Sequence, residues 1–400
     1  MNESMKNFDF QGLFSDRAPG PIPFKEVKRQ KFDFAVAYPD PYSIPINELE
    51  DCLRLALNNE GRDLAVYPHL QGYPPLREYV SNKLKQQRGI DVSEDEIILA
   101  DGSSQPIHMV IESLLNPGDV VITEEYVYSG TLNTLRRFGA DVRGVSCDDD
   151  GMDMDMLEGT IELAISQGKH PKLIYSIPTF QNPQGWTMSL KQRKQLIEIA
   201  QTYRIPVLED DCYVDLRFEG EDVKSLHSID ESGLVIYVGS FSKIIAPGMR
   251  LGYLTGPEEF LSVARALKSG GGVNQFAALA VHRFATGGLD THIDDLNRIL
   301  ITKRDAMLSA LGENMGSNLS WSKPEGALYI WLRLPDHADT TLTVEPAVEV
   351  EVGYHPGVNF APDGISGKNF ARLCYGYNTT DEIQEGIARL AEVFDTAGYI

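Results

Sequence analysis

Short apolar runs alternate with amphipathic stretches through the middle of the chain. The runs predict buried strands at 96–100, 119–123, 141–146, 172–177, 205–209, 234–238 and 251–255. The intervening stretches have helical spacing and predict helices at 105–115, 130–138, 154–165 and 189–203. Because strands and helices alternate, we expect a mostly parallel sheet with helices on both faces.

The pattern changes after Gly256. A long helical region is predicted at 276–311, interrupted at Gly287-Gly288, followed by an aromatic strand at 327–334 and a closing helix at 381–397. The first 45 residues are rich in proline and predict an arm lying over the body. We therefore expect an arm and part of a small domain at 1–45, a large domain at 46–298 and a small C-terminal domain at 299–400.

Composition excludes several classes of protein. With 400 residues, 42% of them hydrophobic, the chain can fill more than one core. Lys and Arg total 36 against 58 Asp and Glu, which gives a net charge of −22. Because so acidic a surface repels phosphate backbones and anionic lipid, we expect neither nucleic acid nor membrane as a partner.

The cysteines and the N-terminus indicate the compartment. Four cysteines are scattered along the chain without a CxxC or Cys/His cluster, so neither a disulfide framework nor a metal site is expected. The N-terminus has no basic and apolar segment typical of a secretory signal. We therefore expect a cytoplasmic protein.

The segment 239–252 carries the strongest chemical signal. Gly239-Ser240-Phe241-Ser242-Lys243 follows a predicted buried strand, and Pro247-Gly248 comes shortly before Arg250. Small residues allow the backbone to approach a ligand, and Lys243 could form a Schiff base with a carbonyl cofactor. Ser240 and Arg250 could hold a phosphate. An isolated Ser-x-Ser-Lys is more often a surface loop, but the complete segment favours the functional interpretation.

Two other segments lie where a predicted strand ends. Ser103 and Ser104 precede a predicted helix, whose N-terminus could bind a phosphate, although a simple N-cap is the commoner reason for serine there. The acidic triplet Glu209-Asp210-Asp211 ends another strand. It could place a carboxylate against a cofactor or form a solvated corner.

Segment 239–252 resembles the lysine signature of fold type I pyridoxal phosphate (PLP) enzymes, specifically the class I/II aminotransferases. Further similar segments follow in order over nearly the whole chain, and the likeness is greatest to the branch of 2-aminoadipate and kynurenine aminotransferases. The resemblance implies an α/β fold, with a mostly parallel seven-stranded sheet in a large domain and a smaller α+β domain. It also implies pyridoxal 5'-phosphate as cofactor and a homodimer.

The resemblance assigns the residues around the cofactor. Lys243 is expected to form the aldimine, Tyr128 to stack on the pyridine ring, and Asp210 to face the ring nitrogen, with Asp211 as the second choice. Asn182 and Tyr213 are expected at the ring oxygen. The expected phosphate ligands are Ser103, Ser104, Ser240, Arg250 and, from the neighbouring subunit across the dimer interface, Tyr67.

The substrate is expected to bind beside these residues. Arg372 corresponds to the arginine that pairs with the substrate α-carboxylate, with Asn182 and Ala37 nearby. Ala37 stands where the family commonly has glycine, and its methyl group is expected to narrow the pocket.

The implied activity is transfer of an amino group from an L-amino acid to a 2-oxo acid through the Lys243 aldimine. The same residues also serve β-lyases and racemases, which remain alternatives, whereas Arg372 argues against decarboxylation. A PLP-sensing transcription regulator needs a DNA-binding domain ahead of this core. Only about 45 residues precede the core, so we do not expect that function. A protein that binds the cofactor without catalysis is a further alternative.

Overall fold

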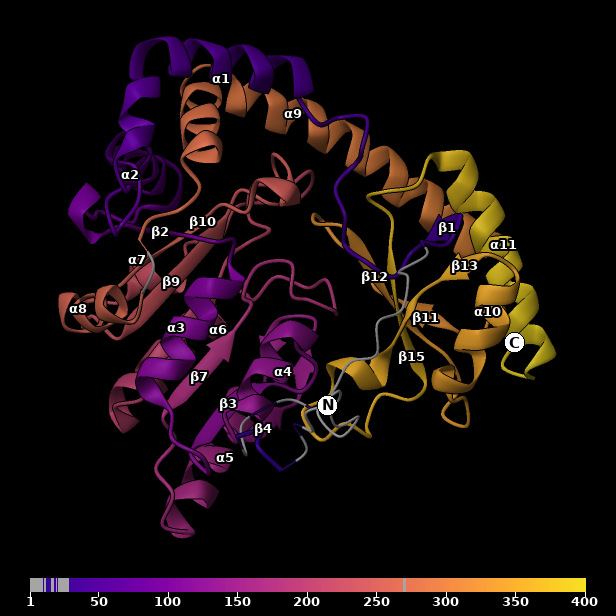
Figure 1. Cartoon of the computed structure of the whole chain (residues 1–400). Helices are drawn as coiled ribbons and strands as arrows, with labels where there is room; N and C mark the ends of the chain where they lie inside the picture. The colour runs from indigo at the N-terminus through magenta and orange to yellow at the C-terminus, as the bar shows by residue number, and fades with distance from the viewer. Residues whose placement is uncertain (1–9, 11, 16–17, 19, 21–28, 269–270) are drawn as a thin grey trace, which may run out of the picture.

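The computed structural model describes residues 10, 12–15, 18, 20, 29–268 and 271–400, and a seven-stranded sheet forms the core of one of its two halves (Figure 1). Its strands, in spatial order, are β2 (Ile98–Ala100), β10 (Gly252–Thr255), β9 (Val235–Ser240), β8 (Val207–Asp210), β7 (Leu173–Ser176), β3 (Val120–Glu124) and β4 (Asp141–Val145). Only β10 runs antiparallel to its neighbours within this sheet. The prediction of a mostly parallel sheet built from these seven runs is confirmed.

Helices cover both faces of the sheet because its strands are apolar on both sides. Val121 belongs to one hydrophobic core, whereas its neighbours Val120 and Ile122 belong to a second core across the sheet. The helices of the first core are α3 (Ser104–Leu114), α4 (Ser129–Arg137) and α8 (Glu258–Leu267). Those of the second are α5 (Met154–Ser166), α6 (Leu190–Tyr203) and α7 (Leu226–Ile229).

A single helix, α9 (Gln275–Asn314), connects the two halves of the molecule (Figure 1). It packs against α1 (Ile46–Glu60) and α2 (Pro74–Lys83) near its beginning and against α11 (Thr380–Thr396) further along. The predicted interruption at Gly287-Gly288 is wrong. Packing along its length keeps the helix continuous and outweighs the low helix propensity of two glycines. The expected domain boundary at 298/299 falls inside this helix.

The C-terminal part contains a four-stranded antiparallel sheet. Its order is β11 (Ser320–Trp321), β12 (Tyr329–Arg333), β15 (Phe370–Cys374) and β14 (His355–Pro356). Beside it, β1 (Phe32–Asp33) pairs with β13 (Val352–Gly353), which brings residues 32–33 to this half. Most of the predicted N-terminal arm up to residue 28 lies outside the described residues.

Short elements complete the structure. They are β5 (Cys147–Asp148), β6 (Gly151–Met152), α10 (Val344–Glu349), the π-helix η3 (Leu84–Arg88), and the 3-10 helices η2 (Gly61–Ala65), η4 (Glu94–Glu96), η5 (Pro247–Met249), η6 (Thr340–Thr343) and η7 (Gly357–Phe360). Across the described ranges, none of the helices combines the length and the apolar character that a bilayer crossing requires.

Candidate active site

A cavity of about 260 Å³ opens where the parallel strands end. Strands β8 and β9 end at Asp210 and Ser240, and the segments after β2, β3 and β7 carry other lining residues. The carboxyl ends of parallel strands share one edge, which is where α/β proteins bind ligands. The predicted site residues that line the cavity are Ala37, Ser103, Ser104, Tyr128, Asn182, Asp210, Tyr213, Ser240, Lys243, Arg250 and Arg372.

Lys243 follows β9 and reaches this cavity. Its Nζ donates a hydrogen bond of 2.7 Å to the carbonyl oxygen of Ala37. Surrounding protein atoms lower the pKa of Lys243 to about 8, because burial disfavours the charged ammonium, although part of the side chain remains open to the cavity. A neutral amine is therefore accessible near neutral pH, and a neutral amine is the form that attacks a carbonyl.

Asp210 presents a buried carboxylate to the cavity. Its Oδ2 accepts a hydrogen bond of 2.7 Å from Tyr175, whose hydroxyl accepts one of 3.0 Å from Thr131. Its Oδ1 is buried and has no hydrogen-bond partner among the described residues. Burial raises the pKa of Asp210, while the contacts with Cys212 and Tyr175 oppose that rise. One oxygen is thus fixed and the other is left for a ligand.

Asp211, the second choice, does not line the cavity. It is buried and forms an ion pair of 3.0 Å with Arg88, and it accepts a hydrogen bond from the Tyr237 hydroxyl. Successive side chains on a strand point to opposite sides, so only one of the two aspartates faces the cavity.

Asn182 lies at the centre of a polar chain on another wall. Its amide nitrogen donates a bond of 3.1 Å to the Tyr213 hydroxyl, and its amide oxygen accepts one of 2.9 Å from Arg372 Nη1. Arg372 Nη2 donates to the carbonyl of Ala35 at 2.6 Å. The guanidinium is therefore held in place, while its Nε is buried without a partner among the described residues.

A cradle for an anion forms at the start of α3. Ser103 is the N-cap residue and makes no capping bond with its side chain, and Ser104 is the first helical residue. The amides of a helix N-terminus attract a negatively charged group. Gly102 has φ +64°, and a Cβ there would stand 2.7 Å from Arg250 Nη2. Glycine therefore allows the backbone to lie this close to the observed position of Arg250.

Tyr128 precedes α4, and its ring folds over the start of that helix. A Cβ on Gly130 would lie 2.6 Å from Tyr128 Cε1, so glycine makes room for the ring. The aromatic side chain lines the cavity, as a residue stacking on a flat ligand must.

His355 is a lining residue that sequence reasoning missed. It pairs in register with Arg372 across β14 and β15. Burial, followed by the charge of Arg372, lowers the pKa of His355 to about 4, so its imidazole is neutral at neutral pH. Val36, Ile177, Cys212 and Ser242 also line the cavity and were not predicted as site residues.

Tyr67 lies outside this cavity. Its side chain is 92% exposed and lines a separate surface hollow with Glu60, Val66 and Tyr73. Within one chain it does not join the other predicted residues, so its role across a dimer interface stays a prediction.

The cavity fits PLP in chemical terms. The unpartnered Oδ1 of Asp210 suits a protonated ring nitrogen, and the cradle of Gly102, Ser103 and Arg250 suits a phosphate. Lys243 supplies the amine that the aldehyde of the cofactor requires.

Comparison with known proteins supports this fit. The family described as "Aminotransferase class I and II" matches residues 42–390. Aromatic-amino-acid aminotransferase 1 of Thermococcus litoralis is 34% identical, covering 96% of this chain and 94% of the relative.

Two solved structures are also similar. The kynurenine aminotransferase of Pyrococcus horikoshii, in complex with PMP, has a TM-score of 0.87 and 36% identity, covering 92% of this chain and 91% of that one. The alpha-aminoadipate aminotransferase of Thermus thermophilus, complexed with N-(5'-phosphopyridoxyl)-L-leucine, has a TM-score of 0.85 and 28% identity, covering 91% and 92%. The predicted resemblance, the fold type and the cofactor are thereby confirmed. The chain belongs to the aminotransferase class I and II family and is a PLP-dependent enzyme that transfers amino groups between amino acids and 2-oxo acids.

Proposed function

We propose that the cavity residues act as the resemblance implies. Lys243 holds the cofactor, Asp210 pairs with its ring nitrogen and Tyr128 stacks on its ring. Asn182 and Tyr213 donate to the ring oxygen, and the phosphate ligands are Ser103, Ser104, Ser240 and Arg250. The observation that carries the proposal is that the Lys243 amine, the unpartnered Oδ1 of Asp210 and the Arg372 guanidinium meet in one cavity.

Bound PLP supplies an electron sink for the charge left on the substrate α-carbon. The residues of the chain supply the rest. Arg372 orients the substrate by pairing with its α-carboxylate, and its bond with Asn182 fixes the plane of the guanidinium. Burial lowers the pKa of Lys243, which favours a neutral Nζ that can accept the α-proton and later return it.

We further propose aromatic L-amino acids as amino donors. The names of the Thermococcus litoralis and Pyrococcus horikoshii relatives point to aromatic side chains. In this chain, Val36 and Ile177 give the cavity apolar walls, and His355 adds a flat, neutral ring. Such walls suit an aromatic side chain better than a charged one.

A single-turnover screen tests both the reaction and the donor. Purified protein with bound PLP is mixed with one amino acid at a time, without an acceptor, and the absorbance of the cofactor is followed. We expect conversion to pyridoxamine phosphate, fastest with phenylalanine, tyrosine, tryptophan or kynurenine and slower with 2-aminoadipate or alanine. Release of ammonia with pyruvate would instead show a lyase. Lys243→Ala should lack the normal absorbance of the bound cofactor, whereas the exposed-site variant Lys194→Ala should keep it.

The homodimer with Tyr67 shared across its interface is also our proposal. Exposed apolar side chains line the surface hollows that contain Tyr67, with exposed fractions of 70% for Val66 and 49% for Phe276. Such a concentration of apolar surface is typical of an interface between subunits.

Hybrid dimers test this arrangement. Chains carrying Lys243→Ala are mixed and reassembled with chains carrying Tyr67→Ala. If Tyr67 acts across the interface, the hybrid has one complete site and regains activity that neither parent has. No recovery in verified hybrids would place Tyr67 in its own subunit's site or outside catalysis.

Two further assignments stay proposals. We propose that residues 46–298 and 299–400 form the large and small domains, with α9 crossing the boundary between them. The cytoplasmic location is supported by four cysteines that are all free thiols.

A further inference from the structure

The three acidic residues at the end of β8 differ in the partners of their carboxylates. Glu209, Asp210 and Asp211 are all buried. Glu209 lies 4.0 Å from the Arg193 guanidinium and accepts backbone hydrogen bonds of 2.8 and 2.9 Å from Leu226 and His227. Asp211 pairs with Arg88 at 3.0 Å. The two outer carboxylates thus each have an arginine, and the middle one faces the cavity.

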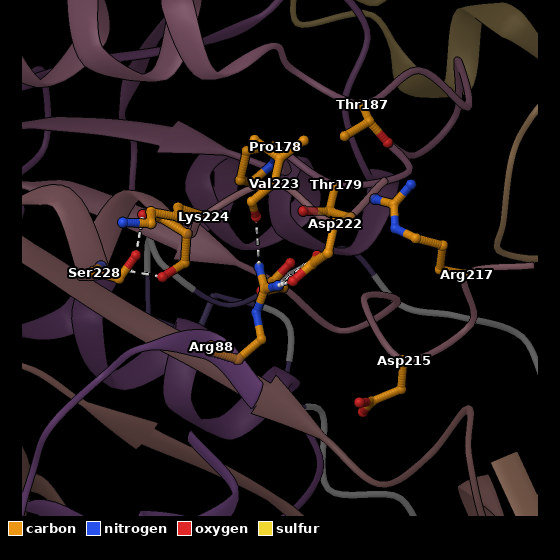
Figure 2. A network of polar contacts seen from close by, with 12 residues as sticks. Arg88, Pro178, Thr179, Thr187, Asp215, Arg217, Asp222, Val223, Lys224 and Ser228 are labelled. Carbon is orange, nitrogen blue, oxygen red and sulfur yellow. Dashed lines mark hydrogen bonds and ion pairs between the residues drawn. The ribbon is translucent and has the colours of Figure 1, made fainter. Parts of the chain in front are cut away.

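Arg88 is the residue that connects Asp211 to the rest of the fold. It ends the short π-helix η3 and is buried. Its Nη1 donates to both oxygens of Asp222 at 2.7 and 2.8 Å, and its Nη2 donates to the carbonyl of Val223 (Figure 2). Nη2 also donates to Asp211. One guanidinium therefore joins η3 to the segment 211–223, which lies more than 120 residues further along the chain.

The negative charge of Asp211 affects the protonation of Asp210. The side chain of Asp211 is fully buried, so water cannot screen it, whereas that of Asp222 is 52% exposed. The negative charge of Asp211 raises the pKa of Asp210, after the larger effect of burial. Without Arg88, Asp211 would be a buried charge that has lost its ion-pair partner, one residue from the carboxylate that must stay ionised.

We propose that Arg88 is a positioning residue of the reaction, which neutralises Asp211 and so keeps the carboxylate of Asp210 ionised against the cofactor. This inference rests on the proposed function, because it needs Asp210 at the ring nitrogen. Arg88 does not line the cavity, and its ion-pair partner Asp211 is the residue adjacent to Asp210.

Other groups also face Asp210 and affect its protonation, but they are the same in every Arg88 variant. They are Tyr175 of β7, Glu124 of β3, Tyr128 before α4, and the adjacent thiol of Cys212. Lys243 lines the same cavity. None of these side chains is altered in the variants of Arg88, so a change in the state of Asp210 reports on the Arg88–Asp211 pair.

The test is the protonation of the ring nitrogen in the full holoenzyme, measured by NMR with ¹⁵N-labelled PLP as a function of pH. In the wild type the nitrogen should stay protonated over the accessible range. In Arg88→Met the ¹⁵N signal should move toward that of a neutral pyridine, because the unpaired charge of Asp211 raises the proton affinity of Asp210 and shifts the shared proton from the nitrogen to the carboxylate. A change of about one pKa unit in Asp210 relative to the nitrogen changes the ratio of the two forms tenfold. Arg88→Lys should restore part of the difference, because it keeps the charge without the fork.

Two further variants separate electrostatics from folding. Arg88→Met combined with Asp211→Asn removes both charges and should return the nitrogen to its wild-type behaviour. Arg304→Met is the matched control, because Arg304 is equally buried but pairs with Glu219 and Asp305 away from the cavity. It should lower stability and leave the ¹⁵N signal unchanged.

The outcomes distinguish the inference from the proposed function. If Asp210→Asn leaves the ¹⁵N signal unchanged, the role of Asp210 itself is wrong. If Asp210→Asn changes the signal but Arg88→Met and Arg88→Lys do not, only the role of Arg88 is overturned. Failure of the double variant to recover would also overturn it, because neutralising Asp211 would then have no effect.

Discussion

Arg372 donates a hydrogen bond of 2.9 Å to the amide oxygen of Asn182. The residue proposed for the substrate carboxylate thus directly holds a residue proposed for the cofactor ring. Asn182 in turn donates to Tyr213, so a continuous polar chain runs from one ligand position to the other. Loss of either end should therefore disturb the binding of both ligands.

A double-mutant cycle measures this coupling. Arg372→Met should reduce kcat/KM at least tenfold, because each charged hydrogen bond contributes about 1.5–3 kcal/mol. Asn182→Ala should also reduce it, and the two effects should not add. For contacting residues we expect an interaction energy of about 0.5–3 kcal/mol.

The control for this cycle pairs Asn182→Ala with Arg333→Met. Arg333 is an exposed arginine on β12, beside the strand that carries Arg372. The two changes should add within error. Additivity in the Arg372 cycle as well would show that the hydrogen bond carries no functional coupling.

The lowered pKa of Lys243 predicts a pH-dependent stability of the protein without cofactor. Its folded pKa of about 8 lies below the ordinary value of 10.5, so the folded state binds fewer protons between these values. The resulting destabilisation is fully present below pH 8 and is lost as the pH rises toward 10.5. At pH 7 it amounts to at most about 3 kcal/mol, less whatever the open cavity screens.

Urea unfolding of apoprotein with Lys243→Met checks this prediction. At pH 7 the wild type should be less stable than the variant, and the difference should change in favour of the wild type as the pH rises from 8 to 10. Lys194→Met, an exposed position, should show no such slope. A difference for Lys243→Met that stays constant with pH would contradict a buried ammonium.

Much of the large sheet and its site could be predicted from the sequence, for local reasons. Strands buried on both faces are continuous apolar runs, and several of the predicted site residues lie at or directly after their ends. Ser103, Asp210 and Ser240 reach one cavity because parallel strands place their carboxyl ends together.

The contacts that the sequence did not reveal join distant segments. Arg88 and Asp211 are 123 residues apart, and nothing in either neighbourhood indicates the other. The carbonyl of Ala35 reaches Arg372 from the far end of the chain. His355 is an ordinary strand residue until its pairing with Arg372 places it in the cavity. Such partners are selected by tertiary packing, which a single sequence does not record.

The continuity of α9 predicts a stabilising substitution. Gly287 is exposed in the helix interior, and a Cβ there would meet no atom within 4 Å. Gly287→Ala should therefore raise the free energy of unfolding by about 0.5–1 kcal/mol, because alanine loses less backbone entropy in a helix. Thermal and urea unfolding measure the change. A loss of stability would show that the helix bends at the glycine pair in solution.

Gly102 and Gly118 both have a positive φ, but the cradle at the start of α3 predicts that only Gly102 affects cofactor binding. Gly102 has φ +64° and no room for a Cβ beside Arg250, whereas Gly118 has φ +89° in open space. An alanine at either position should cost about 1–2 kcal/mol of stability, since the left-handed conformation disfavours a Cβ. Only Gly102→Ala should also displace Arg250 and weaken PLP binding to the apoprotein, by tenfold or more. Fluorescence titration with PLP measures this affinity, and an equal loss in both variants would mean that backbone strain, not the contact with Arg250, determines it.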